Sequence, residues 1–163
     1  MKKIGLLSDT HTYFDEKIYE FFNDCDEIWH AGDFGNIDVV NKLMEFKTLK
    51  GVYGNVDGTE IRKYFPQHLR FFCEEVDVWL THIGGYPGNY SEYVKPEIFN
   101  NTPKLFISGH SHILKVMNDN KLNLLHINPG AAGKSGFQNV RTMVRFIIDN
   151  KTIKELEVFE IKI

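Results

Sequence analysis

The sequence has few cysteines and no long apolar run, and both absences narrow the class of protein. Its 163 residues include only two cysteines, Cys25 and Cys73, which are far apart and have no thiol neighbour. Such a pair forms neither a zinc knuckle nor a redox motif, so we expect a cytoplasmic protein whose thiols pack as small apolar groups. No stretch approaches the roughly 20 apolar residues of a membrane-spanning helix, which predicts no membrane partner.

An excess of positive charge is also absent. The chain has 19 Lys and Arg against 22 Asp and Glu, a formal net charge of -3 at pH 7. Because sequence-independent binding to long nucleic acid needs a basic face, this balance disfavours such a partner. It leaves small anionic substrates open, since bound cations would reverse the local field.

The length and the 42% hydrophobic content predict one domain, residues 1–163, with a full core. In the first half, expected strands alternate with expected helices, which predicts a parallel sheet with helices on its faces. The strands are Ile4–Leu7, Glu27–Trp29 and Leu49–Tyr53, and the helices are Glu16–Asn23 and Ile37–Phe46.

The second half becomes antiparallel towards its end. Turn residues at Asn118–Asn120 and Asp149–Asn150 separate apolar runs and predict two hairpins. The glycine-rich segments Gly84–Gly88 and Gly130–Gly136 are expected to be surface loops. The other expected elements are strands at Leu69–Phe72, Val76–Leu80 and Lys104–Ile107 and a helix at Ser91–Phe99.

Five short motifs each end an apolar run with side chains that can bind a metal. They are Ser8-Asp9-Thr10-His11, Gly32-Asp33, Gly54-Asn55-Val56-Asp57, Thr81-His82 and Gly109-His110-Ser111-His112. A site that gathers so many carboxylate, amide and imidazole donors usually holds a metal, often two. Most of these donors directly follow the carboxyl end of an expected strand, the edge at which ligands bind in open α/β sheets.

The spacing within two of the motifs adds a second argument. Residues two apart in an extended segment point to the same side, so Asp9 and His11, and likewise His110 and His112, are expected to present paired donors. Each motif alone has a plainer interpretation, because Gly-Asp and Gly-Asn are common turns and a single histidine often ends a strand. Their joint occurrence favours a metal site.

In this order and at this spacing, the motifs resemble those of calcineurin-like metallophosphoesterases, specifically the small YfcE-like phosphodiesterase branch. The resemblance runs from Ser8 to Gly130. It implies an α/β fold, a four-layer αββα sandwich of two mixed β-sheets flanked by helices.

The resemblance also implies two divalent transition-metal ions bridged by Asp33. One ion would be bound by Asp9, His11 and His112, and the other by Asn55, His82 and His110. Such a mixed nitrogen and oxygen set suits manganese, iron, cobalt, nickel or zinc better than magnesium or calcium, and manganese is the expected ion.

The implied activity is that of a hydrolase that cleaves a P–O bond of a small phosphodiester. A hydroxide shared by the two ions would attack in line with the leaving alkoxide, with Asp33, Asn55 and His82 as catalytic residues. Many relatives carry a histidine where this chain has Val56. The sequence therefore predicts no leaving-group acid at that position and slow turnover of esters with poor leaving groups.

Two other classes of function stay open, as does self-association. A nuclease acting on short oligonucleotides would need a basic or aromatic groove, for which Arg62–Phe65 is a possible fragment. A non-catalytic scaffold of the same fold is disfavoured by the complete set of donors. Phe71-Phe72 would suit a subunit contact in a homo-oligomer, although core packing explains the pair more simply.

Four further residues have more than one interpretation. His30 is expected to support the site without binding metal, and His126 to be a packed histidine. Arg141 would either contact substrate phosphate or lie on the surface. Asp57 would either orient a neighbouring ligand or be a turn residue or helix N-cap before Gly58-Thr59-Glu60.

Overall fold

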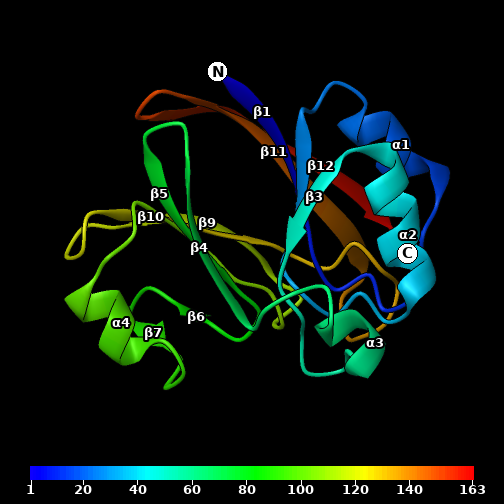
Figure 1. Ribbon diagram of the computed structural model, residues 1–163, viewed down its shortest axis with the longest axis horizontal. Helices are drawn as coiled ribbons and strands as arrows, with labels where there is room; N and C mark the ends of the chain where they lie inside the picture. Colours follow the sequence, from blue (N-terminus) through cyan, green and yellow to red (C-terminus); the bar gives the residue numbers. More distant parts are fainter.

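Two five-stranded β-sheets form the centre of the protein (Figure 1). The computed structural model describes residues 1–163. The first sheet has the order β12-β11-β1-β2-β3, with β1 (Lys2–Leu7), β2 (Glu27–His30), β3 (Thr48–Gly51), β11 (Val140–Asp149) and β12 (Thr152–Lys162). The second has the order β4-β5-β8-β10-β9, with β4 (His68–Cys73), β5 (Val76–Thr81), β8 (Leu105–Ile107), β9 (Leu114–Asp119) and β10 (Leu124–Pro129).

Both sheets are mixed in the same way. Three strands run parallel in each, β1, β2 and β3 in the first sheet and β5, β8 and β10 in the second. The remaining strands pair antiparallel, β11 and β12 in the first sheet and β4 and β9 in the second. Because parallel strands end at the same edge of a sheet, the loops after them collect at one rim, at the bottom of Figure 1.

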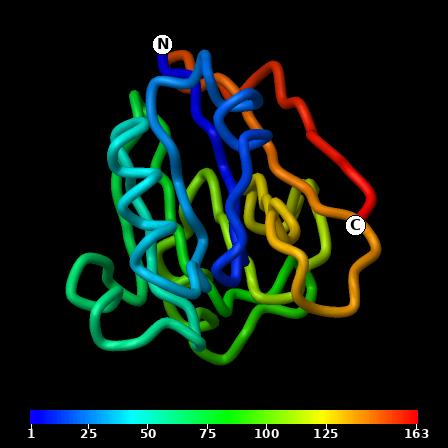
Figure 2. The backbone as a smooth tube through the Cα atoms, turned by 90° about the vertical axis from the view of Figure 1, so that its right-hand side faces the viewer, coloured from blue at the N-terminus to red at the C-terminus, as the bar shows by residue number.

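Apolar side chains between the sheets form the main core. Both sheets contribute fully buried residues to it, among them Trp29 and Phe146 from the first and Val78 and Ile107 from the second. A second cluster lies between the first sheet and the helices α1 (Glu16–Phe22) and α2 (Ile37–Phe46), which cover its outer face in Figure 2. A third cluster lies under α4 (Lys95–Asn100) on the second sheet. This layering confirms the expected αββα sandwich.

Helix α2 shows how local sequence fixes an element. Asn36 accepts a hydrogen bond from the backbone N–H of Val39 and caps the helix at its N-terminus. Val40 and Leu43 lie one turn apart and are fully buried against the first sheet. The helix therefore occupies the residues that the sequence pattern predicts.

Two segments differ from expectation. The segment Gly84–Gly88, expected as a loop, contributes to a small hairpin of β6 (Gly85–Tyr86) and β7 (Asn89–Tyr90). Helix α4 begins at Lys95 and not at Ser91. The cause is Pro96, which is tolerated in the first turn but would clash with a preceding carbonyl if the helix began a turn earlier.

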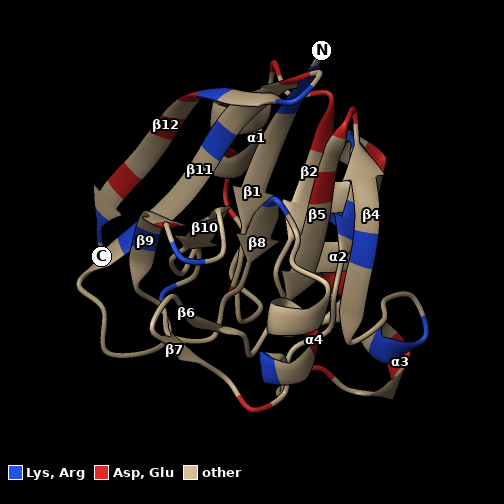
Figure 3. Ribbon diagram, turned by 90° about the vertical axis from the view of Figure 1, so that its left-hand side faces the viewer, with Lys and Arg blue, Asp and Glu red and all other residues tan.

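The charged and apolar groups on the surface, and the length of the helices, are relevant to which partners the protein can bind. Positive and negative residues are interspersed along the strands in Figure 3, in keeping with the small net charge. The side chain of Phe71 packs edge-on against Trp29, whereas Phe72 is exposed. All helices fall short of the length and apolar character that crossing a bilayer requires.

Both cysteine thiols are buried, as the sequence predicts, and should be unreactive in the folded protein. Burial raises the pKa of Cys25 and of Cys73 to about 11, from the 9.0 of an exposed thiol. The thiolate population at pH 8 is then roughly 100-fold below that of a free thiol, and the thiolate is the reactive form. Labelling with a chromogenic disulfide reagent should count no thiol in native buffer and two in denaturant; rapid native labelling would contradict this.

Candidate metal centre

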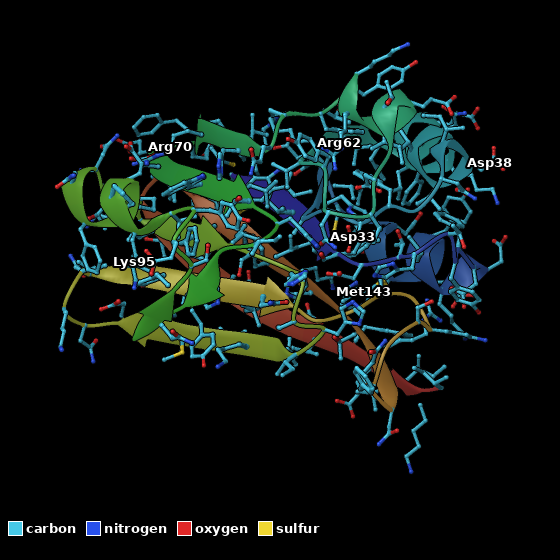
Figure 4. The ribbon with its side chains drawn as sticks, turned by 90° about the horizontal axis from the view of Figure 1, so that it is seen from below. Asp33, Asp38, Arg62, Arg70, Lys95 and Met143 are labelled. Atoms are coloured by element: carbon cyan, nitrogen blue, oxygen red, sulfur yellow. The ribbon has the colours of Figure 1, made fainter.

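The strand-end rim brings the seven candidate donors together, and Figure 4 views it from below with Asp33 near the middle. The loops after β1, β2 and β3 carry Asp9, His11, Asp33 and Asn55. The loops after β5 and β8 carry His82, His110 and His112. The first sheet therefore supplies both carboxylates, and the second sheet supplies three of the four imidazoles.

The donors form two groups. Asp9, His11 and His112 make up the first, and Asp33, His82 and His110 the second; within each group the ligand atoms lie within 4.8 Å of one another. Asn55 adjoins the second group, since its Oδ1 lies 3.1 Å from Nδ1 of His110. These are the two sets that the family resemblance implies.

One oxygen of Asp33 faces both groups. Its Oδ2 lies 3.1 Å from Nε2 of His82 and 3.6 Å from Nε2 of His11. The other oxygen, Oδ1, accepts a hydrogen bond of 3.0 Å from the backbone N–H of Val56. The side chain is thus held by one oxygen and leaves the second at the boundary between the groups.

Asp9 is arranged in the same manner. Its Oδ2 accepts hydrogen bonds from the Ser8 hydroxyl at 2.5 Å and from the backbone N–H of His110 at 3.1 Å. Its Oδ1 is buried without a hydrogen-bond partner and lies 3.1 Å from Nε2 of His112. A buried carboxylate oxygen that lacks a partner is costly unless a cation completes the site.

Two of the histidines are oriented by their second ring nitrogen. Nδ1 of His82 donates to the carbonyl oxygen of Ala31 at 2.7 Å, so in the neutral ring Nε2 holds a lone pair; that atom is buried and unpartnered. Nδ1 of His112 lies 2.9 Å from Oε1 of Gln138, and its Nε2 lies 3.2 Å from Nε2 of His11. Fixing one ring nitrogen so that the other points at a metal is the usual arrangement around metal-binding histidines.

The electrostatics of the rim favour positive charge there. Burial opposes ionisation of Asp9, but interactions with His11 and His112 hold the Asp9 pKa well below its usual range. Burial likewise opposes the charged form of His82, yet the carboxylates of Asp33 and Asp9 raise the pKa of that imidazole. Metal binding displaces such protons, so the donor set, its orphaned atoms and its charge all fit divalent cations.

Most of the donors have a left-handed backbone, which the sequence argument did not anticipate. The φ angles are 54° at Asp9, 44° at His11, 59° at Asp33, 71° at His110 and 62° at His112. The expected extended pairing is therefore wrong, because the strands end before the donors begin. Asp9 and His11 still share a group, but His110 and His112 belong to different ones. Non-glycine residues in this region concentrate at functional sites.

Close packing of the loops depends on two motif glycines. A Cβ built on Gly54 would collide with Oδ1 and the backbone nitrogen of Asp33. A Cβ on Gly109 would collide with the Ser8 hydroxyl and come within 2.9 Å of Oδ2 of Asp9. The glycines of these motifs are needed for clearance around the carboxylates.

Asp57 orients the loop that carries Asp33. The buried carboxylate accepts backbone hydrogen bonds from Asp33 at 2.9 Å, Phe34 at 3.3 Å, Gly35 at 3.0 Å and Gly54 at 2.8 Å. It does not cap helix α3 (Thr59–Arg62), whose N-cap is Gly58. The capping interpretation from sequence is therefore wrong, whereas the turn is present, since the backbone N–H of Asp57 donates to the carbonyl oxygen of Gly54 at 3.1 Å. The sequence signal for this orienting role is the aspartate at the end of the motif Gly54-Asn55-Val56-Asp57.

Arg141 and His30 are both buried supports. Arg141 is 3% exposed and pairs with Asp15 at 2.7 Å, so it is neither a surface residue nor free to meet phosphate. His30 accepts from the backbone N–H of Gly32 at 3.1 Å and contacts the Thr10 hydroxyl, also at 3.1 Å. It thus fixes the loops that carry the donors.

Three cavities border the donor groups, and the largest of them, of about 520 Å³, is lined by His110 and His112 among others. The other two meet at Ile83. One of these two, of about 390 Å³, is lined by His110, Tyr86 and His126 among others. The other, of about 190 Å³, is lined by Asn55, His82 and Arg62 among others.

Comparison with known proteins gives a consistent result. A family model described as calcineurin-like phosphoesterase superfamily domain matches residues 1–151. A probable metallophosphoesterase of Methanothermobacter thermautotrophicus is 29% identical over 138 residues, which cover 78% of this chain and 76% of that protein.

Solved structures share the fold. A novel archaeal phosphodiesterase superimposes with a TM-score of 0.76 at 22% identity, covering 99% of both chains. Vps29 of Entamoeba histolytica in complex with Zn²⁺ gives a TM-score of 0.75 at 12% identity, covering 98% of both chains.

Proposed function

The chain belongs to the calcineurin-like phosphoesterase superfamily, and we propose that it is a phosphodiesterase that uses two divalent ions, manganese being the expected one. The observation that carries the proposal is the pair of donor groups with Oδ2 of Asp33 facing both. Asp9, His11 and His112 would hold one ion, Asn55, His82 and His110 the other, and Asp33 both. When bound, such ions supply Lewis acidity and activate water near neutral pH.

The chain's own residues would set the geometry of the reaction. The Ala31 carbonyl and Gln138 hold the rings of His82 and His112 by their Nδ1 atoms, so their Nε2 atoms stay directed at the carboxylates of Asp33 and Asp9, where the ions would lie. Asn55 is exposed at the rim and would contact a phosphoryl oxygen through its amide N–H. Holding the reacting groups in place removes much of the entropic cost of the reaction.

The two cavities that meet at Ile83 favour a diester over a monoester. A diester carries an organic group on either side of its phosphorus, and each cavity adjoins the donors on a different side of Ile83. A monoester would fill only one of them. Val56, whose side chain is exposed beside the rim, has no proton to give a leaving group. The preferred substrates are therefore expected to have good leaving groups.

The proposal is tested with protein stripped of metal by a chelator. Adding Mn²⁺ should restore hydrolysis of bis(p-nitrophenyl) phosphate, and titration calorimetry should count two ions per chain. Turnover of p-nitrophenyl phosphate should be lower under the same conditions. A protein that binds Mn²⁺ but hydrolyses neither ester would instead fit the scaffold class, and one that turns over without metal would contradict the proposal outright.

Asn55→Ala should weaken one ion more than the other. Asn55 adjoins only the second donor group, so its loss should lower the affinity for one Mn²⁺ by roughly 10- to 100-fold and leave the first nearly unchanged. Titration calorimetry resolves the two binding events. Asn120→Ala, which removes another exposed asparagine in the turn between β9 and β10, at the end of the second sheet opposite the rim, is the matched control. Equal weakening of both ions would contradict the assignment of Asn55 to one group.

A further inference from the structure

The cavity of about 390 Å³ that borders Ile83 has a floor that the proposed chemistry does not use. It extends from His110, at the rim, along the outer face of the second sheet to His126 on β10. The neighbouring residue Ile127 points to the core between the sheets, so His126 points the opposite way, toward the β6–β7 hairpin. His126 is fully buried and borders the cavity.

The hydrogen bonding of His126 fixes what it offers to a ligand. Its Nδ1 lies 3.0 Å from the carbonyl oxygen of Phe106, which can only accept, so Nδ1 carries the proton. In the neutral ring Nε2 is then an acceptor, and this atom is buried without any partner. Burial lowers the pKa of His126 to about 4, so the ring is neutral at physiological pH. An unpaired buried acceptor is a cost that a donor on a ligand would relieve.

The mouth of the cavity is suited to a ring. Tyr86 is 39% exposed, and Nζ of Lys115 lies 3.8 Å from the centroid of its ring. Tyr90 forms a second aromatic wall, its hydroxyl donating to Asp119 at 2.7 Å. The volume of about 390 Å³ lies within the range of small-molecule sites.

We propose that this cavity binds one organic substituent of the phosphodiester, a ring-bearing alcohol of the nucleoside or sugar class, which donates an N–H or O–H hydrogen bond to Nε2 of His126. The ligand class rests on the proposed function, because a rim that holds the phosphoryl group places an ester substituent beside His110. His126 is thereby a residue that determines specificity and takes no part in the reaction itself.

The test measures binding without metal. Adenosine and methyl β-D-ribofuranoside, the free alcohols, are titrated calorimetrically into chelator-treated protein. His126→Asn keeps a donor to the Phe106 carbonyl but removes the acceptor at the position of Nε2, and His126→Gln restores one there. We expect His126→Asn to weaken binding about tenfold and His126→Gln to bind within about threefold of the wild type.

Two variants of surface residues are also needed, because a substitution at the buried His126 can disturb folding as well as binding. Tyr86→Ala should also weaken binding, whereas Tyr64→Ala, which removes another exposed tyrosine that lies outside the cavity, should not. Binding of adenosine alone would support the proposal and identify the base as the donor; binding of both probes would support it and identify the ring hydroxyls. Binding of neither probe, or unchanged binding by both His126→Asn and Tyr86→Ala, would overturn it.

A kinetic measurement separates this inference from the proposed function. The ratio of kcat/KM for thymidine 5′-(p-nitrophenyl phosphate) to that for bis(p-nitrophenyl) phosphate should fall about tenfold in His126→Asn. Nucleoside binding without any turnover would contradict the hydrolase and support the cavity. Turnover of the simple ester with no nucleoside binding and an unchanged ratio would contradict the cavity alone.

Discussion

Asp33→Ala is expected to lower phosphodiesterase turnover by roughly 1,000-fold or more, equivalent to about 4 kcal/mol of transition-state stabilisation. Its Oδ2 faces both donor groups, at 3.1 Å from Nε2 of His82 and 3.6 Å from Nε2 of His11. Without it, both ions would lose a ligand, and their mutual repulsion would no longer be offset by a shared negative charge. Initial rates with bis(p-nitrophenyl) phosphate at saturating Mn²⁺ measure the effect.

Asp38 provides a matched control in the same part of the chain. It is exposed on α2 and lies at the edge of Figure 4, far from the labelled Asp33. Asp38→Ala should keep the wild-type rate and bind two ions. If Asp33→Ala retained full metal-dependent turnover, the bridging role would have to be abandoned, whatever the effect of the other ligands.

Asp57→Ala is expected to lower the free energy of unfolding by about 3 kcal/mol or more, among the larger effects of a single substitution. The carboxylate accepts four backbone N–H groups in the loops that carry Asp33 and Asn55, and its removal leaves them buried without partners. The melting temperature should fall by roughly 10 °C for a chain of this size. Denaturant titration and thermal unfolding of metal-free protein measure it.

Two comparisons distinguish this effect from a general loss of charge. Asp57→Asn keeps one acceptor oxygen and should fall between the wild type and Asp57→Ala. Asp24→Ala removes an exposed carboxylate and should change stability by less than about 0.5 kcal/mol. A fully stable Asp57→Ala would show that the loops are held by other contacts.

Sequence periodicity predicted the architecture well because it reports burial. The α2 bounds are those observed, and the parallel strands and both late hairpins lie within a few residues of their expected places. The donors could be found because each follows a strand, and strand ends are marked by the change from apolar to polar residues. The family resemblance added the division into two sets, and the structure gathers those same sets.

The features that the sequence did not predict depend on contacts between segments that are remote in the chain. No local pattern reveals that Arg141 is neutralised by Asp15, a residue in the loop that precedes α1. The left-handed backbone at Asp9 and Asp33 is imposed by tertiary packing, since neither residue type nor spacing requires it. The unpartnered Nε2 of His126 follows from its bond to Phe106 on the adjacent strand, a pairing that the sequence alone does not specify.

Each donor group draws on both sheets. The first combines Asp9 and His11 with His112 from across the sandwich, and the second combines Asp33 with His82 and His110. An ion coordinated there would cross-link the two sheets at the rim, because its ligands come from both of them. Separating the sheets would expose the main core to water. With an ion bound, this separation would first require release of the ion.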